Sequence, residues 1–350
     1  MPIWEPILHT QSCIKKLERP ILTGDDIPYP CTLVFNAGVA KVNGKYVMVF
    51  RDDYVAADAE NPLKFSGTAV GIAISDNGID GWKVKPKPLI DYQWYKQKCT
   101  NMLGKVEKIK DIVRLYDPRI TVLEGEMYLC LAMDTLHGLR GCIAKLSADF
   151  ESYEIISASV PDNRNMVLFP EKIGGYYVRL ERPFSLYGRK NKGFEMWMSK
   201  SPDLKFWGES ELVLASDAVP FANDKIGPAA PPLKTPYGWL AVFHAVDIDP
   251  NREQNGPWST KWNKRYTAGI MLLDLNNPAK IIGMCKDPLL VPELDYESEV
   301  GYRQNVIFPG GMILEDDGEV KIYYGAADTV ECVATAKLDD LIALCLEGKE

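Results

Sequence analysis

An apolar run, a tight glycine-containing turn and a second apolar run recur five times along this chain of 350 residues. The five copies are residues 42–47, 123–128, 173–178, 235–240 and 315–320. Asn-Gly, Gly-Gly and Asp-Gly turns tolerate the positive φ that a tight turn requires, so each copy predicts a β-hairpin. A third strand follows in several copies, and a meander this small cannot bury its apolar faces alone. The repeat therefore predicts an all-β fold, a five-bladed β-propeller whose blades pack around one axis.

A propeller grows by adding blades and needs no second core, so residues 1–350 are predicted to form a single catalytic domain. Residues from about 1 to about 30 form an N-terminal segment ahead of the first blade. The run Leu338 to Leu346 predicts a short C-terminal helix within 338–350, which we expect to pack on the blades.

The composition narrows the class of protein. Hydrophobic residues make up 46% and charged residues 25% of the chain, as in soluble globular proteins. An apolar run of about 18 residues, which a membrane span needs, does not occur, and the first residues do not resemble a secretory signal. The eight cysteines form no Cys-x-x-Cys pair, which favours free thiols in a cytoplasmic protein. A net charge of −8 argues against nucleic acid as a partner.

Polar side chains interrupt the apolar strands at equivalent places, at the start of the first strand of a repeat or at the end of the second. They are Asn36, Arg51, Tyr116, Asp117, Arg164, Asn165, Arg182, Lys225, His244 and Asp328. Each one alone has a simpler interpretation, because arginines cap strands, an aspartate before proline forms turns, and a histidine in an apolar strand is a core residue. Their repetition in the same register favours one shared pocket on the axis.

The charges of this pocket favour phosphate as a ligand. Its carboxylates are Asp117 and Asp328, and its cations are Arg51, Arg164, Arg182 and Lys225. Hydrolytic glycosidases generally use two carboxylates as acid and base or nucleophile, whereas an excess of guanidinium groups suits phosphate. Phosphate is an anion that attacks without a general base, so one acid suffices to protonate the leaving group. With three histidines in the chain, a metal site is not expected.

Eight motifs, in order along the chain, carry a family resemblance. They are Phe35-Asn36, Phe50-Arg51, Tyr116-Asp117-Pro118-Arg119, Asn163-Arg164-Asn165, Arg182-Pro183, Lys225-Ile226-Gly227, Asn305-Val306-Ile307-Phe308-Pro309 and Tyr323-Tyr324-Gly325 with Ala327-Asp328. Together they resemble glycoside hydrolase family 130, the β-mannoside phosphorylases and their hydrolytic relatives, from about Phe35 to Val330. The resemblance implies a five-bladed propeller and an inverting phosphorolysis that releases α-mannose 1-phosphate from a terminal β-mannosyl residue.

The resemblance also implies residue roles. Asp117 matches the general acid, which is expected to relay its proton through the 3-hydroxyl of the bound mannose. The phosphate site maps to Arg51, Arg164, Asn165, Lys225, His244 and Tyr266. Mannose contacts map to Asn36 and Asp328, and further candidate substrate-binding residues are Tyr116, Arg182 and His137. No cofactor is implied, because inorganic phosphate is a co-substrate, and a homo-oligomer is expected.

One segment departs from the family pattern. Members that act on β-1,4 linkages often carry Gly-Tyr-His-Gly after the second strand of the second blade, where this chain reads Thr135-Leu136-His137-Gly138. This segment is expected to border the acceptor subsite, so the linkage and the acceptor stay open. The insertion at about 91–111 is a candidate acceptor wall or subunit contact, or an ordinary surface loop.

Two alternatives to a phosphorylase remain at this point. A β-mannosidase of the same fold would use water in place of phosphate. A non-catalytic propeller would bind carbohydrate without turnover, but it gives no reason to keep Asp117 among so many cations. The full set of cations favours the phosphorylase.

Overall fold

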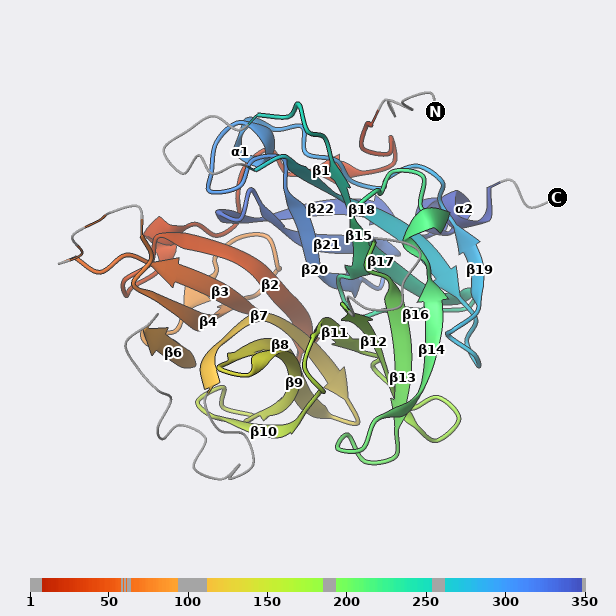
Figure 1. Cartoon of the computed structure of the whole chain (residues 1–350), viewed down its shortest axis with the longest axis horizontal. Helices are drawn as coiled ribbons and strands as arrows, with labels where there is room; N and C mark the ends of the chain where they lie inside the picture. Colours follow the sequence, from red (N-terminus) through yellow and green to blue (C-terminus); the bar gives the residue numbers. More distant parts are fainter. Residues whose placement is uncertain are drawn as a thin grey trace.

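The computed structural model describes residues 8–57, 59, 61, 64–93, 112–184, 193–253 and 262–347. Its strands form five antiparallel sheets arranged around a common axis, so the predicted five-bladed β-propeller is confirmed (Figure 1). The predicted helix at the C-terminal end is also present, as α2 (Leu338–Leu346).

The blades follow one another in chain order. The first contains β2 (Leu33–Val42), β3 (Lys45–Tyr54), β4 (Gly67–Ser75), β5 (Lys83–Val84) and β6 (Ile90–Gln93). The second contains β7 (Ile112–Leu123), β8 (Glu126–Thr135), β9 (Gly138–Leu146) and β10 (Tyr153–Ala158). The third contains β11 (Asn163–Leu168), β12 (Tyr177–Pro183), β13 (Met196–Ser201) and β14 (Gly208–Leu214).

The last two blades differ slightly from this plan. The fourth contains β15 (Lys225–Pro228), β16 (Leu233–Thr235), β17 (Gly238–Ile248), β18 (Lys264–Leu273) and β19 (Ile281–Met284). The fifth contains β20 (Ile307–Leu314), β21 (Glu319–Ala326), β22 (Val330–Lys337) and β1 (Lys15–Lys16). The short helices are η1 (Gly24–Asp26), η2 (Ser216–Ala218) and α1 (Asp295–Ser298). Within the described residues, no helix has the length and apolar character needed to cross a membrane.

The N-terminal segment closes the ring. Strand β1 pairs antiparallel with β22, with Lys15 opposite Thr335 and Lys16 opposite Ala334. The Lys16 ammonium also donates to Glu297 Oε2 at 2.7 Å. The fifth blade therefore combines strands from both ends of the chain, which a two-residue strand is too short to reveal in the sequence.

Three of the five predicted hairpins have both turn residues at positive φ. They are Asn43 and Gly44 (φ 50° and 77°), Glu124 and Gly125 (53° and 78°), and Gly174 and Gly175 (59° and 85°). In the other two, only the glycine is left-handed, at Gly238 and Gly318. The fourth turn differs because Pro236 cannot adopt a positive φ.

The apolar core consists of separate clusters between neighbouring blades. One joins β17 and β18 to β20 and β21, and another joins β12 and β13 to β17. Further clusters join β3 and β4 to β8, β2 and β3 to β21 and β22, and β8 to β11. Each blade therefore buries its faces against the next blade, as expected for meanders that cannot form a core alone.

The innermost strand of every blade is interrupted partway along its length. Its pairing shifts register between Phe35 and Gly38 in β2, between Tyr116 and Arg119 in β7, between Arg164 and Val167 in β11, and between Pro309 and Gly311 in β20. In the fourth blade the inner position is divided between β15 and β16. Such bulges re-aim side chains and often lie beside functional sites.

Candidate active site

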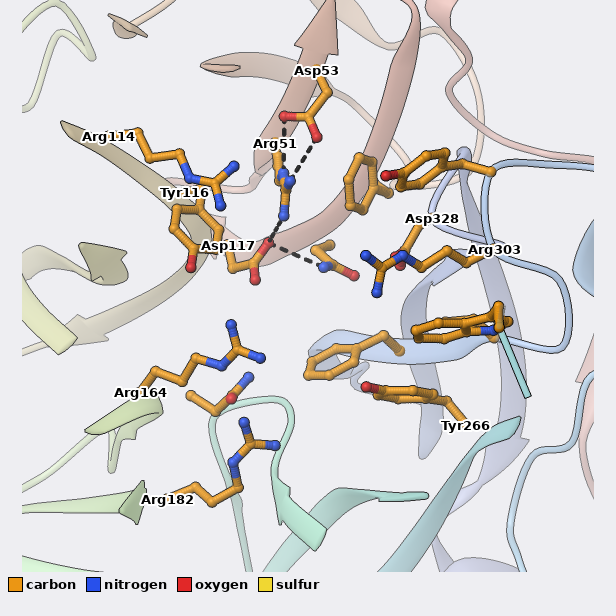
Figure 2. Close-up of a pocket in the computed structure, with 17 residues that line it drawn as sticks. Arg51, Asp53, Arg114, Tyr116, Asp117, Arg164, Arg182, Tyr266, Arg303 and Asp328 are labelled. Carbon is orange, nitrogen blue, oxygen red and sulfur yellow. Dashed lines mark hydrogen bonds and ion pairs between the residues drawn. The ribbon is translucent and has the colours of Figure 1, made fainter. Parts of the chain in front are cut away.

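A cavity of about 250 Å³ lies where these interruptions meet on the axis (Figure 2). Nine of the twelve residues singled out from the sequence line it: Asn36, Arg51, Tyr116, Asp117, Arg164, Asn165, Arg182, Tyr266 and Asp328. They come from all five blades, so the predicted shared pocket exists. Their individual roles stay predictions.

Asp117 lies in the bulge of β7 with a φ of 51°. Its Oδ1 accepts hydrogen bonds from Asn36 Nδ2 at 3.0 Å and from Arg51 Nη1 at 3.2 Å. Its Oδ2 has no hydrogen-bond partner among the described residues, which leaves this oxygen for a ligand. Burial acts to raise the pKa of Asp117, but Arg51, Arg119 and the Asn36 bond together lower it below its ordinary value. Without a ligand, Asp117 is therefore a carboxylate at neutral pH.

Arg51 is held between two carboxylates. Its Nε and Nη2 donate to the two oxygens of Asp53 at 3.1 Å and 2.6 Å, and its Nη1 reaches Asp117. Its guanidinium also lies over the rings of Phe35 and Tyr116. Arg51 lies above Asp117 in Figure 2 and fixes its position. Its contact with phosphate stays a prediction, because two carboxylates already offset its positive charge.

Arg164 and Arg182 form a cationic wall opposite Arg51, below Asp117 in Figure 2. Within the described residues neither guanidinium has an ion-pair partner, and the Nε of each is buried without a hydrogen bond. Burial and the charge of Arg164 lower the pKa of Arg182 to about 9. Buried cations without counterions are costly, so this wall is suited to bind an anion.

Lys225 does not line the cavity, but it lies close enough to Arg182 and Arg164 for their charges to act on it. It is 9% exposed, and its ammonium lies 5.3 Å from the centre of the Tyr266 ring. Its carboxylate neighbour, Asp224, is 3.6 Å away and pairs more closely with Lys264, at 2.8 Å. Burial, followed by the charges of Arg182 and Lys264, lowers the pKa of Lys225 to about 6. Lys225 is therefore mostly neutral at pH 7 until an anion arrives.

His244 is fully buried and also does not line the cavity. Burial and the neighbouring cations hold the pKa of His244 well below its ordinary value, so the imidazole is neutral. Arg182 Nη1 donates to its Nε2 at 2.9 Å, and the network assigns the proton to Nδ1, which donates to the Pro228 carbonyl at 3.2 Å. His244 therefore orients Arg182, and the structure shows no free nitrogen on it for phosphate.

Aromatic and carboxylate groups form the remaining wall. The Tyr116 hydroxyl donates to Asp134 Oδ1 at 2.9 Å. Tyr266 and Trp262 stack with ring centres 5.9 Å apart. Asp328 has a φ of 49°, and burial raises its pKa although Arg303 opposes this shift. A sugar placed between these groups would contact apolar ring faces and hydrogen-bonding carboxylates.

His137 lies elsewhere. It is exposed in the turn between β8 and β9 and does not line the cavity. Its predicted place beside the acceptor subsite stays a prediction, and most of the predicted insertion at 91–111 lies outside the described residues. Among those that the structure does describe, no group of three or more His, Cys, Asp or Glu side chains could hold a metal ion.

The sequence patterns did not single out Asp53, Arg114, Trp262 and Arg303, which also line the cavity. Alternation along β3 could have revealed Asp53, because it shares a face with Arg51 two residues earlier. The same spacing relates Arg114 to Tyr116 in β7. Arg303 belongs to a segment outside the strands, so no alternation of side chains predicts its position. Its Nε lies 3.6 Å from Asp328 Oδ2.

Comparison with known proteins assigns the chain to a family. A family model described as beta-1,4-mannooligosaccharide phosphorylase matches residues 14–347. The chain belongs to glycoside hydrolase family 130. In this family, a beta-1,4-mannooligosaccharide phosphorylase of Ruminococcus albus is 32% identical over 330 residues, which cover 93% of this chain and 88% of the relative. A 1,2-beta-oligomannan phosphorylase of Thermoanaerobacter sp. is 31% identical over 316 residues, 88% of this chain and 91% of the relative.

A solved structure of family 130 shows the same fold. The beta-1,2-mannobiose phosphorylase from Listeria innocua, in complex with beta-1,2-mannobiose, matches with a TM-score of 0.74 at 24% identity. The match covers 95% of this chain and 99% of that chain. The propeller deduced from the repeats is therefore the family fold over nearly the whole sequence.

Proposed function

We propose that this family 130 enzyme is an inverting β-mannoside phosphorylase. The observation that carries the proposal is a cavity in which the acid candidate, Asp117, faces the cationic wall of Arg164 and Arg182. Both arginines lack an ion-pair partner among the described residues, so an inorganic dianion would complete the wall. The phosphorylase relatives in the family support the same conclusion.

Phosphate would bind against Arg164 and Arg182, with Asn165 beside them and Lys225 behind. Bidentate guanidinium contacts fix the orientation of phosphate as well as its charge. Held there, a phosphate oxygen would attack the anomeric carbon of the terminal β-mannosyl residue on the face opposite the leaving group. The product would be α-mannose 1-phosphate, and the cations would offset the charge of the attacking group without a general base.

Asp117 would donate the proton that the departing sugar oxygen needs. Its free Oδ2 is the oxygen available to carry this proton, because Oδ1 already accepts two bonds. The family resemblance implies a relay through the 3-hydroxyl of mannose, and Asn36 and Asp328, which line the cavity, would hold the sugar for that relay. A phosphate dianion beside Arg164 would offset part of the positive charge that lowers the pKa of Asp117. Phosphate binding would thus help the acid to acquire its proton.

Hydrolysis is the second candidate, because three carboxylates line the cavity: Asp53, Asp117 and Asp328. Asp53 is committed to Arg51 through two hydrogen bonds, which leaves Asp328 as the base candidate. A water-activating role for Asp328 would leave the cationic wall without a purpose, so phosphorolysis is the better account.

Incubation of the enzyme with mannobiose, with and without inorganic phosphate, tests the proposal. A phosphorylase releases mannose 1-phosphate and one mannose only when phosphate is present. Release of two mannose molecules in phosphate-free buffer would instead establish a hydrolase. The linkage is resolved by comparing β-1,2- and β-1,4-mannobiose, because relatives of both kinds occur in the family. The acceptor is resolved by the reverse reaction, with α-mannose 1-phosphate and glucose, mannose or N-acetylglucosamine.

Three further proposals concern the setting of the enzyme. We propose that it works without a cofactor, assembles as a homo-oligomer and resides in the cytoplasm. The seven described cysteines are all free, and five are buried, which supports a reducing compartment. Light scattering of the purified protein tests whether it is a homo-oligomer. Activity that survives dialysis against a chelator would support a reaction without a metal cofactor.

A further inference from the structure

The peptide unit between Asn36 and Ala37 is gripped at both ends by side chains from other blades. Its carbonyl oxygen accepts a hydrogen bond of 2.9 Å from Nη1 of Arg119, in the second blade. Its N–H donates a hydrogen bond of 2.6 Å to Oε1 of Glu331, in the fifth blade. Arg119 is 3% exposed and Glu331 is fully buried, so water does not compete for either bond.

These two side-chain hydrogen bonds take the place of ladder hydrogen bonds that the peptide does not make within the sheet. The register of β2 against β3 shifts between Phe35 and Gly38, which takes the peptide out of the regular ladder. Buried backbone groups must then find other partners. Asn36 also has a φ of 55°, a conformation that persists only where the surroundings impose it.

Backbone from the fifth blade packs against the two peptide units that flank the Asn36–Ala37 peptide. A Cβ on Gly310 would lie 1.9 Å from the Ala37 carbonyl oxygen, and one on Gly325 would lie 2.8 Å from the Asn36 nitrogen. Only glycine permits these approaches. The peptide therefore has little room to shift while its two hydrogen bonds are intact.

The Asn36 side chain transmits this placement to the acid, because its Nδ2 donates to Oδ1 of Asp117 at 3.0 Å. Arg119 also holds the neighbour of Asp117, since its Nη1 donates to the Pro118 carbonyl at 2.7 Å. A third bond, from Arg119 Nε to the Ala229 carbonyl at 2.7 Å, anchors it to the fourth blade.

We propose that Arg119 and Glu331 are positioning residues for the reaction, which fix the Asn36–Ala37 peptide and thereby aim the Asn36 amide at Asp117. The inference rests on the proposed role of Asp117 as the acid. It assigns a task to two buried ionisable side chains that touch neither the cavity nor, in the proposed mechanism, the substrate.

A purely stabilising role explains Glu331 poorly. Its Oε2 is buried without a hydrogen bond among the described residues. Burial raises the pKa of Glu331 to about 8, although the Ala37 N–H and Arg119 oppose this shift. A buried carboxyl with an unsatisfied oxygen costs stability that an apolar residue of similar size would avoid. What an apolar residue could not do is accept the Ala37 N–H.

The test is a double-mutant cycle between Glu331 and Asn36. The variants are E331A, N36A and the double variant, with E331Q as the conservative replacement that keeps an acceptor. E315Q is the matched control, because Glu315 is a partly buried glutamate of the same blade that bonds Lys41 and Lys321 outside the active-site cavity. For each variant, kcat, KM for phosphate, the pH profile of kcat and the melting temperature are measured.

We expect E331A to lower kcat about tenfold, the loss of roughly one hydrogen bond, with KM for phosphate within about twofold of wild type. The alkaline limb of its kcat profile should move to higher pH, because losing the Asn36 hydrogen bond raises the pKa of Asp117. The charges of Arg51, Arg119 and Arg164 would still lower that pKa. N36A should give the same shift, and the double variant should lose no more than N36A does. E331Q should keep activity within about twofold of wild type, since its carboxamide oxygen still accepts the Ala37 N–H.

Two results would overturn the inference. One is an E331A enzyme that, like E315Q, loses melting temperature without a change in the pH profile of kcat. The other is additive losses in the double variant, which would show that the two residues act independently. If E331A does not fold, E331D is measured with the same expectations, because its shorter side chain no longer reaches Ala37. Phosphate-independent turnover by wild type would refute the proposed function alone, since the same cycle can be measured on hydrolysis.

Discussion

Anion binding at the cationic wall should take up about one proton at pH 8, and Lys225 is the group that takes it. Its pKa is lowered to about 6 by burial and by the charges of Arg182 and Lys264. In the free enzyme, Lys225 is therefore only about 1% protonated at pH 8 and about 10% at pH 7. An anion bound at the neighbouring wall of Arg164 and Arg182 favours the charged ammonium and raises this pKa, so binding and protonation are linked.

The direction of the pH dependence follows from this linkage. Above pH 6 the free lysine has lost its proton, whereas the anion-bound lysine still holds it. Affinity should consequently fall about tenfold for each pH unit between pH 6.5 and 8.5, the slope expected for one linked proton. Below pH 6 the lysine is protonated in both states, and the dependence on Lys225 should level off.

Isothermal titration with sulfate measures this proton uptake directly. Sulfate is suitable because it stays doubly charged throughout the range, so it neither releases nor binds protons itself. Heats at pH 8 in two buffers of different ionisation enthalpy give the number of protons taken up. K225M should abolish the uptake, and K264M should reduce it at pH 7, because removing that charge raises the pKa of Lys225 in the free enzyme. D117N should keep the uptake. Wild-type affinity that does not change between pH 6.5 and 8.5, or uptake lost in D117N alone, would refute the reasoning.

Four other predictions concern the loss of one side chain or of one segment. D117N should abolish turnover and leave sulfate affinity largely intact, and more than about a tenth of wild-type activity would count against Asp117 as the acid. R164A should raise KM for phosphate far more than KM for the mannoside, and equal effects measured by steady-state kinetics would make Arg164 merely structural. H244A should raise KM for phosphate, whereas H244Q, which retains an acceptor for Arg182, should keep KM for phosphate close to the wild-type value. A folded H244Q enzyme with a KM as high as that of H244A would contradict the orienting role of His244. Deletion of residues 1–17, which removes β1 and the Lys16 ion pair, should lower the melting temperature by several degrees in calorimetry, and an unchanged value would show that ring closure does not depend on β1.

The features of the fold that repeat were predictable from the sequence. Hairpins with Asn-Gly or Gly-Gly turns have a local cause, the positive φ of two adjacent residues, so each copy could be recognised independently. The blade count followed from the copies. Closure by β1 could not be recognised, because two paired residues leave no alternation of apolar and polar side chains. Its evidence is tertiary: the pairing of Lys15 and Lys16 with a strand more than three hundred residues later.

The membership of the site was more predictable than its internal contacts. Polar residues at strand ends in a repeated register indicated which side chains would meet on the axis. The sequence could not indicate which of them pair with one another. Arg51 is held by Asp53 and Asp117, and His244 by Arg182, so two residues expected to touch phosphate also have protein partners. The Arg51–Asp117 and Arg182–His244 contacts depend on distances across blades, which no spacing along one strand encodes.

The bulges explain why the site and the closure of the propeller depend on each other. A bulge turns a side chain such as Asp117 toward the axis, but it also removes nearby peptide groups from the sheet. Those groups are buried and need partners from other blades, as the Asn36–Ala37 peptide finds in Arg119 and Glu331. The acid is therefore placed by side chains of the first, second and fifth blades together. A change in the packing of the fifth blade against the first should reach Asp117 through Asn36 even though the altered residue lies outside the cavity. G325A tests this, since a Cβ there would press on the Asn36 nitrogen and Oδ1, at 2.8 Å and 3.1 Å. We expect it to lower kcat and leave sulfate affinity unchanged. A loss of sulfate affinity as large as the loss of kcat would show that the first blade positions the cationic wall as well.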